Sequence, residues 1–131
     1  KARLHLTMPT IVFKEFSPCI VLGAPGGNAI LSALVQTLSN VVDFGMSAVE
    51  AVSATRIHAE GANIWCEARV RGDVVADLRQ RGFNVIQDAQ AFGGRLARAQ
   101  VVIMKDDGTL DGASDLRGAS GVVYARPASV P

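Results

Sequence analysis

A glycine-rich turn between two apolar segments constrains the fold of this chain more than any other feature. The run Pro18 to Leu22 has the apolar, β-branched character of a buried strand, and the turn Gly23-Ala24-Pro25-Gly26-Gly27 follows it at once. Beyond the turn, apolar residues from Ile30 to Val42 recur at the spacing of one wide helix face. We therefore expect a buried strand, a tight turn and a long helix capped by Asn28.

The same strand has a predicted hairpin partner on its N-terminal side. The run Thr10 to Lys14 has strand character, and the short polar turn Glu15 to Ser17 separates it from the buried strand. Because apolar residues occupy consecutive positions in both runs, we expect both faces of this hairpin to be buried. A second hairpin is expected around Asp106-Asp107-Gly108, between strands at Gln100 to Met104 and Thr109 to Asp111.

The middle of the chain alternates helical and extended patterns. Ser47 and Glu50 have the spacing of a capping box, which predicts a short second helix. The alternation from Asn63 to Val70 predicts a strand whose polar residues form a solvated face. A helix from Asp73 to Gln80 and a short strand from Phe83 to Ile86 are expected next. Hairpins with helices grouped between them indicate an α+β fold rather than a doubly wound parallel sheet.

Length and composition indicate one domain with a large apolar share. The 131 residues fit a single domain over 1–131, with 49% hydrophobic and 19% charged residues. This balance predicts that another protein surface covers part of the chain. The net charge of +1 does not indicate a basic surface that would bind nucleic acid or an anionic membrane. No apolar run approaches the roughly 20 residues that a membrane-spanning helix needs. Cys19 and Cys66 lack metal-site spacing and are expected to be buried free thiols.

The glycine turn is the strongest candidate for a binding role. A helix N-terminus presents unpaired N–H groups and the positive end of the helix dipole, so it attracts anions. Two glycines let the backbone approach a ligand closely, which makes the N–H groups of Gly26 and Gly27 candidate donors to an oxyanion. The local pattern alone favours a turn that only reverses the chain.

The titratable residues form no local catalytic pattern. His5 and His58 lie too far apart in sequence for a triad to be read, and each is expected to be structural. Asp115 is expected to pair with Arg117 or to cap a turn. No nucleophile and base are therefore assigned from spacing.

Taken together, these segments resemble the small subunit of the gamma-glutamyltranspeptidase family of N-terminal nucleophile hydrolases. The resemblance covers nearly the whole chain. Its motifs, in chain order, are Met8-Pro9-Thr10-Ile11-Val12, Leu22-Gly23-Ala24-Pro25-Gly26-Gly27, Val42-Asp43-Phe44-Gly45-Met46, Ala54-Thr55-Arg56, and Asp107-Gly108 followed by Gly112-Ala113-Ser114-Asp115. The resemblance implies that this α+β chain is a portion of a four-layer αββα N-terminal nucleophile hydrolase fold.

The resemblance also implies a reaction. In that family, autoproteolysis exposes an N-terminal threonine that attacks a gamma-glutamyl amide and forms an acyl-enzyme, with its own α-amino group as the base. The Pro-Gly-Gly turn donates to the oxyanion, so this catalytic role carries over to the backbone N–H groups of Gly26 and Gly27. The acyl group then passes to water or to an amino acid or peptide. The scheme requires no cofactor and no metal.

Two departures from the family pattern bear on activity. The family's nucleophilic threonine lies upstream of Lys1, and the chain does not begin with methionine. We therefore expect a C-terminal segment of the small subunit, inactive alone, with the large subunit and the N-terminal part of the small subunit as partners. The family's Ser-Ser pair, which helps hold the substrate carboxylate, corresponds to His5 and Leu6. Because leucine donates no hydrogen bond, glutamyl specificity is open and acylase or other amidase specificity is an alternative.

A second class of function is also open, namely a non-catalytic α+β domain that binds ligands or associates with itself. The apolar strands Ile11 to Phe13 and Ile20 to Leu22 are expected to be covered by the rest of the enzyme and, alone, to drive oligomerisation. In the leading interpretation the substrate is a small-molecule gamma-glutamyl or other amide. No nucleic-acid or membrane partner is expected, and the compartment is open, with a periplasmic or extracellular location compatible with the resemblance.

Overall fold

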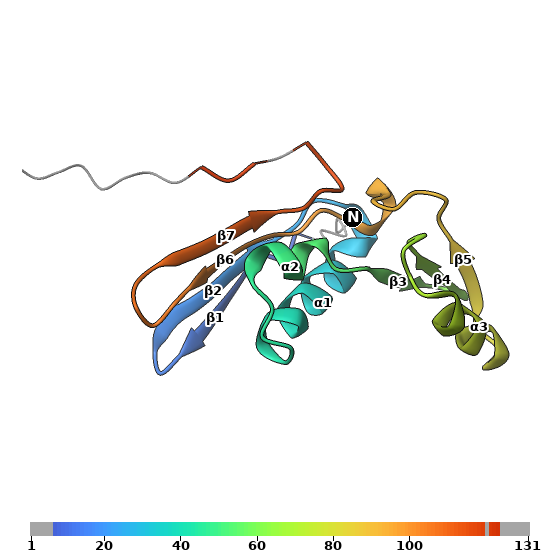
Figure 1. The fold of residues 1–131 in the computed structure, drawn as a ribbon, viewed down its shortest axis with the longest axis horizontal. Helices are drawn as coiled ribbons and strands as arrows, with labels where there is room; N and C mark the ends of the chain where they lie inside the picture. The colour runs from blue at the N-terminus through green and yellow to red at the C-terminus, as the bar shows by residue number, and fades with distance from the viewer. Residues whose placement is uncertain (1–6, 120, 124–131) are drawn as a thin grey trace, which may run out of the picture.

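Two β-sheets organise the chain in the computed structural model, which describes residues 7–119 and 121–123 (Figure 1). The four-stranded sheet has the order β1-β2-β6-β7, and the three-stranded sheet has the order β3-β4-β5. The strands are β1 Thr10–Lys14, β2 Ser17–Gly23, β3 Ile57–Glu60, β4 Asn63–Cys66, β5 Asn84–Gln87, β6 Gln100–Met104 and β7 Leu110–Ser114. The helices are α1 Ile30–Val42, α2 Ala48–Ser53 and α3 Gly72–Gln80, with 3-10 turns at Gly27–Ala29 and Gly94–Leu96. This mixture confirms the expected α+β class.

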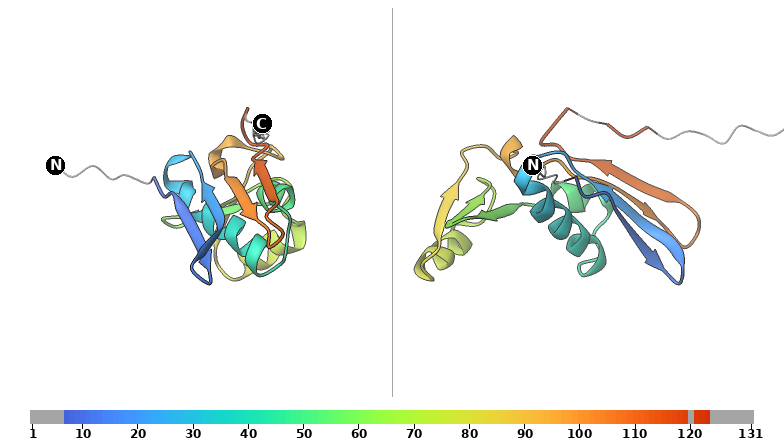
Figure 2. Two further views of the ribbon diagram at one scale, coloured as in Figure 1. Left: turned by 90° about the vertical axis from the view of Figure 1, so that its left-hand side faces the viewer. Right: turned by 180° about the vertical axis from the view of Figure 1, so that it is seen from behind.

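Helices α1 and α2 pack on one face of the four-stranded sheet (Figure 2). Alternate strand residues point toward these helices, because successive side chains of a strand face opposite sides. The resulting core joins β2, α1, α2, β6 and β7 through Ile20, Leu22, Ile30, Ala33, Leu34, Ala48, Val52, Val101 and Ala113. The wide apolar stripe predicted for α1 thus covers the strand that precedes it.

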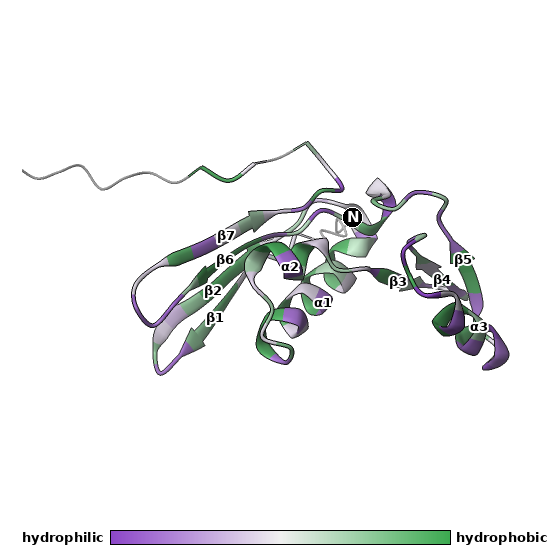
Figure 3. Cartoon of the chain, viewed as in Figure 1, coloured by the Kyte–Doolittle hydropathy of each residue, from purple (hydrophilic) through white to green (hydrophobic). Residues whose placement is uncertain are grey.

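The other face of this sheet is exposed, so the prediction that both faces of the first hairpin are buried is wrong for this chain. Ile11 pairs with Val21, and Val21 pairs with Val102, which places one apolar row across three adjacent strands. These residues are 55%, 40% and 37% exposed, respectively. Figure 3 shows hydrophobic residues along these strands. Helices of this chain cover only one side of the sheet. A continuous apolar run in the sequence does not show whether one face or both faces of a strand are covered.

The smaller sheet adds a parallel strand to an antiparallel hairpin. Strand β3 pairs antiparallel with β4, and β4 pairs parallel with β5. Helix α3 makes the crossover between the two parallel strands, as such a connection requires. Val75 of this helix packs with Cys66 and Val85 in a small core of its own. The predicted helix from Asp73 to Gln80 is confirmed.

The strand predicted from Asn63 to Val70 is too long. It ends at Cys66, and Glu67, which the alternating pattern assigned to a solvated face, is fully buried. A carboxylate is buried only where cations or donors compensate the lost water, and two arginines contact Glu67 here. Tertiary ion pairing therefore overrides the local pattern after Cys66.

The two predicted helix caps have opposite outcomes. Ser47 and Glu50 form a complete capping box at the start of α2, as expected. Asn28 does not cap α1, whose N-cap is Ala29 without a side-chain cap bond. The Asn28 amide donates instead to the carboxylate of Glu60, at the end of β3. A long-range contact has replaced the local one.

Both cysteines are free thiols, as predicted. Cys66 is buried, and this burial raises the pKa of its thiol. Cys19 is only partly buried, and its thiol lies 3.4 Å from the carbonyl oxygen of Val12. Within residues 7–119 and 121–123, no three histidine, cysteine or acidic side chains cluster as a metal site. None of the described helices combines the length and apolar character needed to cross a bilayer.

A buried ion network ties the ends of both sheets together. Arg56 precedes β3, Glu67 follows β4, and Asp115 and Arg117 follow β7. The carboxylate of Asp115 accepts from Arg56 Nη1 at 2.7 Å and from Arg117 Nη1 at 2.8 Å, and Arg117 Nε donates to Glu67. No member is more than 6% exposed. The expected Asp115–Arg117 pair is confirmed as part of this larger network.

The two arginines of the network keep the carboxylate of Asp115 ionised inside the protein. Burial raises the pKa of Asp115. Hydrogen bonds from the Arg117 backbone N–H and the Arg56 side chain, together with the positive charges of Arg56 and Arg117, lower it by more. The pKa of Asp115 therefore lies below its ordinary value. Arg117 also donates to the carbonyl oxygens of Val52 and Ala54, each at 2.8 Å. Among the described residues, no buried side-chain nitrogen or oxygen lacks a hydrogen-bond partner.

Loss of Asp115 should destabilise the protein strongly. Asp115→Ala leaves two buried guanidinium groups without their shared carboxylate, so the free energy of unfolding should fall by about 3–5 kcal/mol. Urea denaturation followed by circular dichroism measures this change. Asp73→Ala is the matched control because Asp73 pairs with Arg71 on the surface, where an ion pair contributes little. Equal losses in both variants would contradict the proposed importance of the network.

Candidate active site

The glycine turn lies between the end of β2 and the 3-10 turn that leads into α1. Gly26 has φ 145° and ψ 24°, and Gly27 has φ 60°, which residues with a Cβ atom rarely adopt. Within the described residues, no hydrogen bond uses the backbone N–H of Gly26 or Gly27. These N–H groups stand where the first donors of a helix are unpaired. The turn thus has the free donors that were expected, while their role toward an oxyanion stays a prediction.

A second segment supports the turn from one side. The backbone N–H of Arg98 donates to the carbonyl oxygen of Pro25 at 3.0 Å. A Cβ atom on Gly26 would lie 2.4 Å from the Cβ of Ala97, so only glycine fits there. The carbonyl oxygen of Ala97 in turn accepts from Arg56 of the ion network at 3.3 Å. The buried network therefore holds the segment against which the glycine turn rests.

A shallow pocket of about 330 Å³ opens beside the turn. It is lined by Gly26, Asn28, Ala29, His58, Glu60, Trp65 and Arg95. These residues come from the turn, from the β3–β4 hairpin and from the 3-10 turn at Gly94–Leu96. The sequence did not predict the pocket, because nothing in residue spacing reveals that β3 and Arg95 meet the glycine turn.

A line of polar contacts fastens β3 to the start of α1. Glu60 accepts from the Asn28 amide, and Glu60 Oε2 lies 3.4 Å from His58 Nε2. The other imidazole nitrogen of His58, Nδ1, lies 2.9 Å from Ser32 Oγ on α1. Hydrogen bonds from Asn28 and then from His58 lower the pKa of Glu60, so its carboxylate is ionised at neutral pH. The buried, paired position of His58 fits the structural role expected for it.

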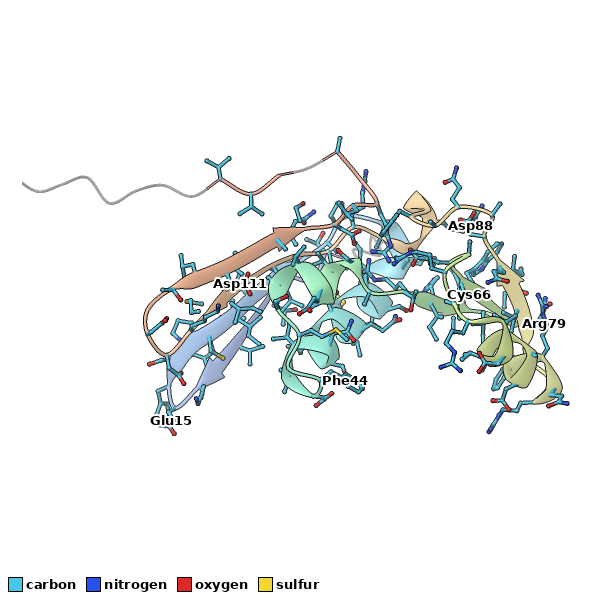
Figure 4. All side chains as sticks on the ribbon, in the orientation of Figure 1. Glu15, Phe44, Cys66, Arg79, Asp88 and Asp111 are labelled. Atoms are coloured by element: carbon cyan, nitrogen blue, oxygen red, sulfur yellow. The ribbon has the colours of Figure 1, made fainter. Side chains whose placement is uncertain are left out.

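A larger hollow of about 500 Å³ lies at the tips of the two hairpins. It is lined by Lys14, Glu15, Ser17, Pro18, Cys19, Met104, Lys105 and Asp106. Figure 4 shows Glu15 at this tip, at the opposite end of the molecule from Arg79 on α3. Its Lys14–Asp106 pair is mostly solvated and no helix begins there. We therefore place the candidate site at the smaller pocket, where free backbone donors and ionised side chains meet.

His5 and Leu6, the positions assigned to the family's Ser-Ser pair, lie outside the described residues. Their contribution to substrate binding stays a prediction.

Comparison with known proteins confirms the family resemblance that the ordered motifs indicated. The family model described as Gamma-glutamyltranspeptidase matches residues 1–125. The glutathione hydrolase proenzyme of Escherichia coli K12 is 31% identical over 119 residues, which cover 89% of this chain and 20% of that protein. The acylase ACY 1 proenzyme of Pseudomonas sp. strain V22 is 33% identical over 106 residues, which cover 81% of this chain and 18% of that protein.

Solved structures agree with the sequence comparison. The gamma-glutamyltranspeptidase of Pseudomonas nitroreducens complexed with L-DON superimposes with a TM-score of 0.83 at 28% identity, over 96% of this chain and 65% of that chain. The fold is therefore a portion of the N-terminal nucleophile hydrolase fold. More narrowly, the chain belongs to the gamma-glutamyltranspeptidase family. It spans about a fifth of the length of the proenzymes that it matches.

Both glycines have a positive φ but only Gly26 lies against Ala97, so substituting each should show what the close contact adds to the backbone cost. Gly26→Ala places a Cβ against Ala97 and should lower the Tm markedly, whereas the Cβ in Gly27→Ala meets no atom within 4 Å. The second variant should carry only the cost of a positive φ, of order 1 kcal/mol. Thermal denaturation of the two variants tests this difference. Equal Tm values would show that Ala97 does not confine Gly26.

Proposed function

We propose that this chain carries the oxyanion-binding turn of an acyl-transferring enzyme. The complete enzyme would cleave a small amide through an acyl-enzyme and pass the acyl group to water, an amino acid or a peptide. The observation that carries the proposal is the pair of unpaired N–H groups at Gly26 and Gly27, on a turn that borders a pocket. In this view residues 1–131 form the C-terminal segment of the small subunit, and the attacking threonine comes from another part of the enzyme.

The turn would act by stabilising developing charge. When a nucleophile adds to an amide carbonyl, negative charge gathers on the carbonyl oxygen, and fixed N–H donors lower the energy of that state. Removal of one such donor typically reduces kcat about 10²- to 10³-fold. Two contacts hold the turn in place before substrate arrives: the hydrogen bond from the Arg98 backbone N–H to the Pro25 carbonyl oxygen, and the contact of Ala97 with Gly26. Such preorganisation avoids a rearrangement during the reaction.

The acyl group of the substrate has two candidates. Gamma-glutamyl amides come first, because most of the matched relatives are glutathione hydrolase proenzymes. A different acyl group comes second, because an acylase proenzyme matches at similar identity and because His5 and Leu6 replace the hydroxyl pair expected to hold the glutamyl carboxylate. The two candidates share one mechanism and differ in the contacts made by the acyl portion.

Direct assay of the complete enzyme tests the reaction and its specificity. We expect it to release the amine from a chromogenic gamma-glutamyl anilide, and intact-mass spectrometry should detect the acyl-enzyme after rapid quenching. Turnover of a simple acyl anilide instead would assign acylase specificity within the same mechanism. If neither substrate acylates the enzyme, the non-catalytic alternative replaces the proposal.

We further propose that the remainder of the enzyme covers the exposed apolar row of Ile11, Val21 and Val102. A row of this kind on one sheet face is uncommon at a free surface, and its burial provides about 25 cal/mol per Å². Self-association of the isolated chain through this face is the alternative.

A charge placed in this row should distinguish covered from free surface. Val21→Asp should lower the Tm of the complete enzyme by several degrees, while the isolated chain, in which Val21 is 40% exposed, should lose much less. Val74→Asp on α3 is the matched control, since Val74 is similarly exposed at 43%. Gel filtration of the isolated Val21→Asp chain reports any loss of self-association. Similar Tm losses for both variants in the complete enzyme would argue that nothing covers the row.

A further inference from the structure

Ala97 has a backbone conformation that residues other than glycine rarely adopt. Its φ of 62° and ψ of 173° lie in a region that is essentially restricted to glycine, because a Cβ atom crowds the backbone there. The other described non-glycine residues with a positive φ are Glu15 and Phe16, in the exposed turn of the first hairpin. Ala97 is instead fully buried. Such a conformation persists only where the surrounding contacts hold the residue in place.

The buried ion network supplies these contacts on both sides of Ala97. Arg56 Nη1 donates to the carbonyl oxygen of Leu96 at 3.5 Å and to that of Ala97 at 3.3 Å. The conformation of Ala97 thus turns two successive carbonyl groups toward one guanidinium nitrogen. Two residues further on, the backbone N–H of Ala99 donates to the carboxylate of Asp115 at 3.0 Å. The strained residue is therefore fixed from before and from after.

The peptide unit between Ala97 and Arg98 joins the network to the glycine turn. Its carbonyl oxygen accepts from Arg56, and its N–H donates to the carbonyl oxygen of Pro25 at 3.0 Å. A trans peptide unit is planar and rigid, so its C=O and N–H groups point in opposite directions. One rigid unit therefore sets the position of the turn relative to the buried guanidinium.

Ala97 also closes the space beside the turn. A Cβ atom on Gly26 would lie 2.4 Å from the Cβ of Ala97 and 2.5 Å from its Cα. Glycine has more accessible backbone conformations than any other residue, so Gly26 and Gly27 need outside contacts to keep one of them. The methyl group and the backbone of Ala97 together restrict the alternatives open to Gly26.

We propose that Ala97 is a positioning residue for the oxyanion-binding turn, held in its strained conformation by the ion network so that the N–H groups of Gly26 and Gly27 keep one direction. The inference deepens the proposed acyl transfer and rests on it. Donors that are already aimed stabilise a transition state without a rearrangement during the reaction. The strain at Ala97 thereby exchanges stability for activity, as active sites often do.

The test compares the Ala97→Gly variant of the complete enzyme with the wild type. Glycine adopts this conformation without strain but is also free to leave it, so the Tm should equal or exceed that of the wild type. We expect kcat with a chromogenic gamma-glutamyl anilide to fall about 10- to 100-fold, since a misplacement of about 1 Å can cost about 100-fold. KM should stay within about twofold, because an interaction made in the transition state changes kcat rather than ground-state binding.

Ala51→Gly is the matched control. Ala51 is 1% exposed in the middle of α2, where glycine is disfavoured, so this variant should have a lower Tm and a kcat within about twofold of the wild type. A purely structural role for Ala97 predicts the same behaviour for both variants. Opposite responses of Tm and kcat in the two variants would therefore identify positioning.

Hydrogen–deuterium exchange followed by mass spectrometry gives a measurement that needs no catalysis. The Arg98 N–H reports the contact with the turn because it donates to Pro25. Its exchange in the complete enzyme should become about tenfold faster in Ala97→Gly and stay unchanged in Ala51→Gly. If the complete enzyme cleaves no amide, the proposed function fails, and this exchange rate tests the positioning role alone.

Two results would overturn the inference. An Ala97→Gly enzyme that keeps the wild-type kcat and the wild-type exchange at Arg98 would show that the turn does not depend on Ala97. A loss of kcat accompanied by a lower Tm would show a structural defect in place of a positioning role.

Discussion

The buried ion network is the interaction on which the rest of the structure depends. Asp115 lies between Arg56 and Arg117, and Glu67 completes the charge balance. The four residues come from segments that follow or precede β3, β4 and β7, so a single cluster fixes where both sheets end. An apolar cluster of the same size would fill this space, but it would not satisfy the backbone carbonyl groups that the two arginines bind.

The network reaches the glycine turn through two backbone contacts. Arg56 donates to the carbonyl oxygen of Ala97, and Asp115 accepts from the backbone N–H of Ala99 at 3.0 Å. In this segment, Ala97 lies in close contact with Gly26, and the backbone N–H of Arg98 donates a hydrogen bond to the carbonyl oxygen of Pro25. Buried charges thereby help to set the position of the backbone groups that we propose for the oxyanion. The polar residues of the core and of the site form one connected system.

Local chemistry predicted much of this fold. The hairpins, the capping box at Ser47 and the helix after Arg71 each depend on neighbouring residues, which are visible in a linear pattern. The glycine turn was also recognisable, because its motif stands between a strand and a helix in sequence. Its importance came from the ordered motifs around it rather than from the turn itself.

What sequence reasoning missed depends on partners far apart in the chain. Strand β3 has little apolar alternation, and it exists because it pairs with β4 and joins Asn28 through Glu60. The burial of Glu67 required arginines that lie 50 residues away in one case. In the sequence, Arg95 is one of several scattered cationic residues. In the structure it lines the same pocket as Glu60. The spacing of residues in the sequence does not predict such long-range contacts.

The contact between Gly26 and Ala97 has an evolutionary consequence. A Cβ on Gly26 would lie 2.4 Å from the Cβ of Ala97 and 2.5 Å from its backbone Cα, so replacing Ala97 by glycine would not make room for a side chain at Gly26. The space beside Gly26 is closed by main-chain atoms as well as by a methyl group. Glycine should therefore persist at position 26 among descendants of this sequence, whatever residue comes to replace Ala97.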